Sequence, residues 1–137
     1  PTAGDAKRSA RLAAVQTLYQ MEYGQERREG VHLEEGEQVA TPHSGLMKEI
    51  VFTVADRGAT IDDILRQSLD NEWPLERLEV VLRAILRAGV AELLLSSKTP
   101  APILISDYVD VAHAFFAGKE PGLVNAVLDR VAKLVRS

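Results

Sequence analysis

The residue types most suited to binding chemistry stand near the two ends of the chain. Lys7, Arg8 and Arg11 form a basic cluster near the start, although the 137-residue chain is acidic overall, with a formal net charge of −4. Near the other end, Asn125 and Asp129 stand four residues apart within an apolar pattern of helical spacing. Core packing alone does not require an asparagine at position 125. Together, the two features favour an RNA-binding protein over an enzyme.

The basic cluster is local, because charge is unevenly distributed along the chain. Residues 1–11 carry a net charge of +2, whereas residues 24–40 carry −3. A polyanion is therefore expected to approach the N-terminal end and to be repelled elsewhere. Lys7 and Arg11 are four apart and share a helix face. Three phosphate contacts bind weakly and in a salt-dependent way, so the cluster predicts part of a site for single-stranded RNA that needs a second contributor. Ordinary solvated charge is the alternative interpretation of so small a cluster.

Motifs typical of enzymes are absent from the sequence. There is no phosphate-binding P-loop, dinucleotide fingerprint, HExxH or GxSxG motif. Cysteine is also absent and the three histidines lie in separate segments, so neither a metal site nor a cofactor is predicted. The pairs Asp62–Asp63 and Asp107–Asp110 could act as acid and base, but carboxylates near helix starts are common. No catalytic residue is assigned.

Helical periodicity without strand alternation predicts an all-α fold, a compact bundle in one domain. We expect an N-terminal helical half over residues 1–72 and a C-terminal half over 73–137. No apolar run is long enough to span a bilayer and no signal peptide is recognisable, so a cytoplasmic location is expected. In the first half we expect a helix from about Asp5 to Tyr23 ended by Gly24, a polar loop over 24–42, a helix from Ser44 to about Gly58 and a helix capped by Thr60. In the second half we expect a helix with Pro74 in its first position and a helix that starts at Ser106 or Asp107 and is ended by Gly118. A last helix follows a connection over 119–122.

The helix after Pro74 is predicted to be central, because apolar residues cover much of its circumference. Gly89 lies in its interior, where glycine costs about 1 kcal/mol relative to alanine, so a close helix crossing is expected there. Glu79, Arg83 and Arg87 follow at four-residue intervals and are expected to form an exposed series of ion pairs. The prolines of residues 99–102 predict a linker.

Several stretches resemble the NusB family of bacterial transcription antitermination factors over nearly the whole chain outside the 24–42 loop. Residues 13–20 (Ala-Ala-Val-Gln-Thr-Leu-Tyr-Gln) follow the basic turn as the family's V-Q-x-L-Y pattern does. Residues 85–93 are similar to the central I-L-R-x-A-x-Y-E-L segment, and residues 102–109 to the P-x-x-V-A-I-N-E-A region. Residues 123–129 are similar to the F-V-N-G-V-L-D signature.

The resemblance implies an all-helical fold of two small subdomains and a cytoplasmic role without catalysis. It also implies binding of boxA single-stranded RNA together with the ribosomal small-subunit protein NusE, within the RNA polymerase antitermination complex on ribosomal RNA operons. Matched position by position, it implies RNA contacts by Lys7, Arg8 and Arg11, with Gln16 and Tyr19 on the same helix. Glu92 matches the glutamate on the side offered to the protein partner.

Some positions depart from the family pattern. Ser9 interrupts the basic run, Ala91 replaces a tyrosine and Leu123 replaces a phenylalanine, and leucine cannot stack on a base as an aromatic ring can. Lys119 precedes the last helix, where its charge could compensate by reaching phosphate. Asn125 is assigned to the RNA-binding set, with satisfaction of neighbouring backbone groups as the alternative role for its amide.

Two other functions are compatible with the pattern. A NusB-like domain also occurs as the accessory RNA-binding module of ribosomal RNA cytosine methyltransferases, but the sequence ends after its last helix and a catalytic domain is not expected. A helical dimerisation protein without RNA binding is the third class. The sequence leaves open whether the chain forms a homodimer.

Overall fold

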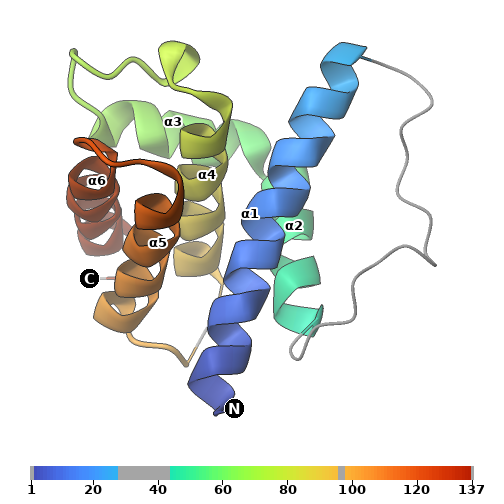
Figure 1. The fold of residues 1–137 in the computed structure, drawn as a ribbon. Helices are drawn as coiled ribbons and strands as arrows, with labels where there is room; N and C mark the ends of the chain where they lie inside the picture. Colours follow the sequence, from blue (N-terminus) through green and yellow to red (C-terminus); the bar gives the residue numbers. More distant parts are fainter. Residues whose placement is uncertain (1, 28–43, 96–97, 137) are drawn as a thin grey trace.

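The protein is built from α-helices. The computed structural model describes residues 2–27, 44–95 and 98–136, and these contain no strand, which confirms the all-α prediction. Figure 1 shows the helices packed as one bundle. The elements are α1 (Ala3–Arg27), α2 (Ser44–Asp56), α3 (Gly58–Ser68), the short 3-10 helix η2 (Leu75–Arg77), α4 (Val80–Leu94), α5 (Ala101–Phe115) and α6 (Glu120–Val135). No helix in the described ranges combines the length and apolar content needed to cross a membrane.

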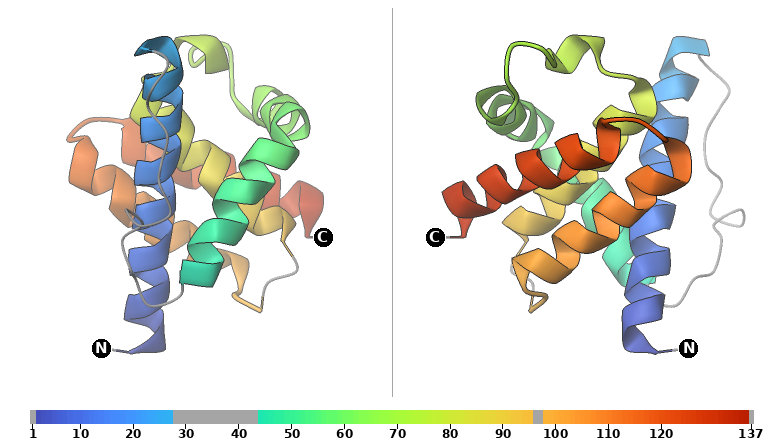
Figure 2. Two further views of the ribbon diagram at one scale, coloured as in Figure 1. Left: turned by 90° about the vertical axis from the view of Figure 1, so that its right-hand side faces the viewer. Right: turned by 60° about the vertical axis from the view of Figure 1, so that its left-hand side comes forward.

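Helix α4 is the centre of the bundle, as the sequence predicts. It contacts α1, α2, α3, α5 and α6, and most of its residues are buried. Figure 2 shows α5 and α6 crossing on one side of α4 while α1 and α2 lie on the other. An apolar stripe that covers much of a helix can be buried only by neighbours on several sides, so α4 holds both ends of the chain in one core. The division into halves at residue 72 stays a prediction.

Gly89 lies where α4 packs closely against Leu128 of α6. A Cβ atom added at Gly89 would lie 2.7 and 2.8 Å from the two methyl groups of Leu128, which is itself fully buried. These distances are well below van der Waals contact, so a side chain at Gly89 would have to displace the side chain of Leu128. The prediction of a close helix crossing is confirmed.

Several helix boundaries differ from those expected, and proline explains two of them. Helix α5 begins at Ala101 and not at Ser106 or Asp107, with Pro102 in its first turn. Helix α6 likewise begins at Glu120, inside the expected connection, with Pro121 in its first turn. The first N–H groups of a helix have no partner within the helix, so proline loses nothing there. The linker prediction is therefore wrong for residues 101–102, which lie in α5.

Other boundaries also differ from those expected. Helix α1 continues through Gly24 to Arg27, so residues 24–27 are not loop, and residues 28–42 of the expected polar loop lie outside the described residues. Thr60 lies within α3, which starts at Gly58. Pro74 precedes η2, and α4 starts only at Val80. The expected helix end at Gly118 also comes later than the observed end of α5 at Phe115.

The expected series of exposed ion pairs along α4 is also corrected. Arg83 pairs with Glu22 of α1, with 3.0 Å between Nη2 and Oε1. Arg87 binds Asp62 of α3 through Nε at 2.9 Å and Nη2 at 3.0 Å, and also approaches Glu22. The arginines therefore connect α4 to neighbouring helices and do not pair along its own surface with Glu79.

Candidate nucleic-acid interface

A buried ionic cluster joins α1, α4 and α5 beneath the N-terminal basic residues. Arg11 donates through Nε and Nη2 to the two carboxylate oxygens of Glu92, at 2.8 and 2.6 Å, and through Nη1 to Oδ2 of Asp107 at 2.6 Å. The hydroxyl of Tyr108 donates to Glu92 Oε1 at 2.9 Å. Only 1% of the Arg11 side chain and none of Glu92 is exposed. The fork of Arg11 thus satisfies two carboxylates that burial would otherwise make costly.

The electrostatics of the cluster keep Arg11 and Tyr108 in their ordinary protonation states. Burial lowers the pKa of Arg11, but the hydrogen bond and charge of Glu92, with smaller contributions from Tyr108 and Asp107, raise that pKa by more than burial lowers it. Burial raises the pKa of Tyr108 well above its usual value, and the negative charge of Glu92 raises it further. Arg11 therefore stays charged and Tyr108 stays a neutral donor.

Two residues assigned to binding surfaces from the sequence lie inside this cluster. The sequence predicts that Arg11 contacts RNA and that Glu92 faces a protein partner, yet both are buried and bind each other. A side chain with no exposed surface cannot reach a phosphate or a partner unless the cluster opens, and opening would leave charges unpaired in the core. In this structure Arg11 and Glu92 link α1 to α4 inside the core.

Arg8 is the exposed member of the basic cluster. Its side chain is 58% exposed, and Nε donates to Oδ1 of Asp107 at 3.3 Å. The two Nη atoms of Arg8 have no hydrogen-bond partner among the described residues. Lys7 is half-buried, with Nζ 3.4 Å from Oγ1 of Thr99. The three predicted cations thus separate into one buried, one partly covered and one free to bind an anion.

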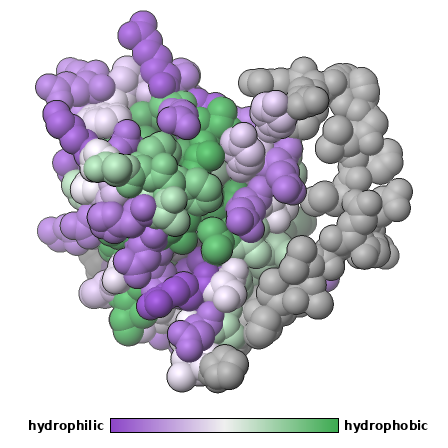
Figure 3. All heavy atoms as spheres, in the orientation of Figure 1, coloured by the Kyte–Doolittle hydropathy of each residue, from purple (hydrophilic) through white to green (hydrophobic). Residues whose placement is uncertain are grey.

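The remaining predicted residues of α1 continue from Arg8 along the helix. Gln16 is exposed, and the ring of half-buried Tyr19 stacks on Tyr23 with centroids 5.8 Å apart and planes 10° from parallel. At 3.6 residues per turn, Arg8 and Tyr19 lie on nearly the same face, about 16 Å apart along the axis. Figure 3 shows hydrophilic and apolar side chains interleaved on the face of the molecule that it presents. Arg8 and Tyr19 therefore place a guanidinium and an aromatic ring along one side of α1.

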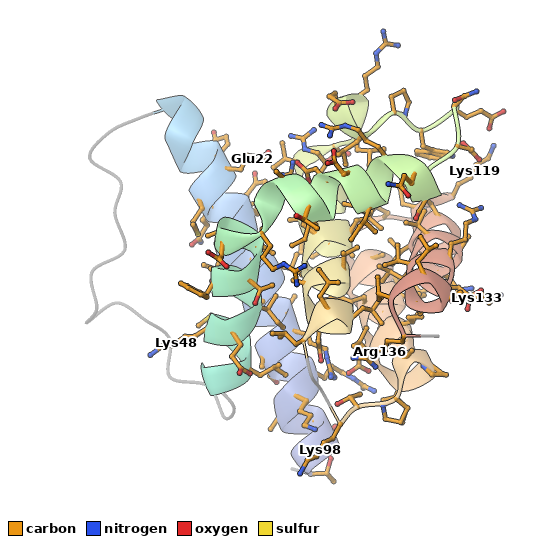
Figure 4. All side chains as sticks on the ribbon, turned by 180° about the vertical axis from the view of Figure 1, so that it is seen from behind. Glu22, Lys48, Lys98, Lys119, Lys133 and Arg136 are labelled. Atoms are coloured by element: carbon orange, nitrogen blue, oxygen red, sulfur yellow. The ribbon has the colours of Figure 1, made fainter. Side chains whose placement is uncertain are left out.

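Lys119 precedes α6 and Asn125 lies on it. Figure 4 shows Lys119 at the opposite end of the molecule from Lys98, whose neighbour Thr99 contacts Lys7. Lys119 is exposed beside the first turn of α6. Asn125 is exposed on α6 and lines a groove of about 290 Å³ between α5 and α6, together with Pro102, Ser106 and Asp129. The structure therefore does not gather the predicted residues into one site, because Arg11 is buried and Lys119 lies at the end of the molecule opposite Lys98.

Comparison with known proteins identifies the family. The model of the NusB family matches residues 8–133, which is nearly the whole chain. The chain belongs to the NusB family. The transcription antitermination protein NusB of Allorhizobium ampelinum is 42% identical over 93% of this chain and 86% of that protein, and NusB of Mesorhizobium japonicum is 42% identical over 93% and 89%.

Solved structures agree with the NusB assignment. A T. maritima NusB structure superimposes with a TM-score of 0.75 at 27% identity, covering 92% of this chain and 89% of that one. A chain from a crystal structure of the antitermination factors NusB and NusE in complex with dsRNA gives a TM-score of 0.75 at 28% identity, covering 95% and 98%. These values extend the family likeness from sequence to fold.

Sequence reasoning misses two residues that organise this part of the NusB fold. Arg136 of the C-terminal segment donates to the backbone oxygens of Leu93 at 3.1 Å, Thr99 at 2.8 Å and Glu92 at 3.3 Å, and so satisfies carbonyl groups at the end of α4. Asp107 is suggested by the sequence as a helix start or as an acid or base, yet it links Arg8 to Arg11. Neither role leaves a signal in the sequence, because each depends on partners far along the chain.

The variant Tyr108→Phe should lower the free energy of unfolding by about 1–2 kcal/mol at pH 8, because Glu92 loses a buried donor while keeping Arg11. The folded state raises the pKa of Tyr108, so its contribution is complete below the unfolded value of about 10 and is lost as the pH rises beyond it. Urea unfolding of both proteins should therefore show a difference that shrinks above about pH 10. A difference that grows with pH would contradict the assigned direction of the hydrogen bond.

Proposed function

We propose that this NusB-family chain is a transcription antitermination factor that binds the boxA RNA of nascent ribosomal RNA transcripts together with the ribosomal protein NusE. In this role it would join the RNA polymerase antitermination complex in the cytoplasm and catalyse no reaction. The names of its relatives support this function, as does the likeness to a structure that contains NusB, NusE and RNA. The accessory module of a methyltransferase is not favoured, because those relatives match over most of their own length.

The observation that carries the proposal is the free guanidinium edge of Arg8. Its Nη donors have no partner among the described residues, and the side chain stands in solvent at the start of α1. Two parallel N–H donors match two oxygens of a phosphate group. Tyr19 lies three turns further along the same face, where its edge could pack against an RNA base. A site of this size binds weakly alone, so a second protein is part of the proposal.

The test is binding of a boxA-type single-stranded RNA to the full chain, with and without NusE, across a salt series. Arg8→Ala should weaken binding and reduce the slope of log K against log salt by about 0.7, the value for one phosphate contact on a single strand. The matched control is Arg66→Ala, because Arg66 is also exposed but pairs with Asp63 and Glu76 on α3 and η2. Equal binding by Arg8→Ala and the parent chain would overturn the proposed contact.

Further arms of the same experiment define the extent of the site. A duplex of the same sequence tests whether a single strand is preferred, since the related structure holds dsRNA. Lys119→Glu tests whether the RNA extends to the connection between α5 and α6, far from Arg8. Weaker binding is the expected result for this variant, and an unchanged affinity at low salt would remove Lys119 from the site. The molecular mass measured in solution, with and without the RNA, would show whether a homodimer forms and whether RNA binding dissociates it.

A further inference from the structure

Asp107 connects the buried cluster to the exposed arginine. Its Oδ2 accepts from Arg11 Nη1 at 2.6 Å, and its Oδ1 accepts from Arg8 Nε at 3.3 Å. Only 7% of the Asp107 side chain is exposed, against 58% for Arg8. The carboxylate is therefore held from below by a short charge-assisted bond, and it presents its second oxygen to the arginine at the surface.

The atom through which Arg8 is held decides which donors remain. Because Nε faces Asp107, the fork formed by Nη1 and Nη2 remains without a partner among the described residues. That edge carries the parallel N–H groups that bind a phosphate through two oxygens. A free arginine in solvent samples many rotamers and loses that freedom on binding, whereas an anchored one has lost part of it already.

We propose that Asp107 is a positioning residue for RNA binding, which orients the guanidinium of Arg8 toward a phosphate group. Arg11 and Glu92 hold Asp107 in place from the core, so the buried cluster acts on RNA through Arg8 without touching it. This inference rests on the proposed function and adds to it a residue that neither the basic cluster nor the family motifs assign.

Whether removal of the Asp107 carboxylate weakens or strengthens RNA binding distinguishes a positioning role from simple charge repulsion. A carboxylate near a polyanion weakens binding by repulsion, so removal of an Asp107 without a positioning role should strengthen RNA binding. If Asp107 orients Arg8, removal should weaken binding although a negative charge is lost. Asp110 supplies the control, because it is exposed on the same helix and has no ion pair among the described residues.

The decisive experiment measures binding of the boxA-type single-stranded RNA, with NusE present, to Asp107→Asn and Asp110→Asn. We expect Asp107→Asn to bind about 3- to 10-fold more weakly, the range for loss of one typical hydrogen bond. Its salt slope should stay that of the parent, because Arg8 keeps its charge. Asp110→Asn should bind as the parent does, or slightly more tightly. Equal or tighter binding by Asp107→Asn would overturn the inference.

Two further variants separate this effect from loss of folding and from failure of the proposed function. Asp107→Asn in an Arg8→Ala background should bind as Arg8→Ala alone, because Asp107 acts only through Arg8. Arg8→Lys leaves the core untouched and keeps the charge, but its single ammonium group has no Nε to anchor, so weaker binding at an unchanged slope is expected. An additional loss in the double variant, or full affinity for Arg8→Lys, would refute positioning. An unaffected Arg8→Ala would instead refute the proposed RNA contact itself.

Discussion

Replacing Arg11 by methionine is expected to lower the free energy of unfolding by about 3–5 kcal/mol, the cost of breaking a buried ion pair from one side. Methionine approximates the length of the arginine stem, so the loss reflects charge more than volume. The variant leaves Glu92 fully buried with only Tyr108 as a donor, and leaves Asp107 with only the 3.3 Å contact to Arg8. Urea unfolding followed by circular dichroism measures the change.

The control for this prediction is Arg66→Met. Arg66 also pairs with two carboxylates, Asp63 at 3.2 Å and Glu76 at 2.7 Å, but it stands 49% exposed on the surface. Exposed pairs contribute little because water solvates the separated charges, so the loss of stability should be far smaller than for Arg11→Met. Comparable losses in the two variants would mean that burial does not govern the role of Arg11.

The Arg11 cluster also shows what the sequence could not predict. Lys7, Arg8 and Arg11 look equivalent in a basic run, and the resemblance to the family places all of them at the RNA. Yet Arg8 and Arg11 differ by about 60° around the helix, enough to put one at the surface and the other in the core. The partners of Arg11 lie 81 and 96 residues further along the chain. Local spacing gives the helix face but does not give the long-range partner.

Features set by local periodicity were predictable. The all-α class, the central position of α4 and the close crossing at Gly89 follow from apolar patterning and from one costly glycine. Helix starts were less predictable, because Pro102 and Pro121 fit the first turn of a helix as well as they fit a linker. Of the candidate site, the basic run points to Arg8 on α1, whereas the anchoring role of Asp107 needed coordinates.

The crossing at Gly89 yields a prediction in which the sign of a mutational effect reverses. In the parent chain, Gly89→Ala should destabilise by about 0.5–2 kcal/mol, because overpacking against the buried methyl groups of Leu128 costs more than the helix propensity gained. Leu128→Ala alone should cost about 2–5 kcal/mol through the cavity it leaves. Leu128→Ala removes the three atoms nearest to the added Cβ, so in that background Gly89→Ala should stabilise by up to about 1 kcal/mol.

A double-mutant cycle by urea unfolding measures this coupling, which should lie within the range of about 0.5–3 kcal/mol found for residues in contact. Gly45→Ala on α2 is the control, because a Cβ there would meet nothing within 4 Å and the change should be neutral or stabilising in both backgrounds. If Gly89→Ala stabilised the parent chain as it should stabilise the Leu128→Ala variant, α4 and α6 would not be in tight contact at this point. Close packing against Leu128 would then not explain why glycine stands at this position of α4.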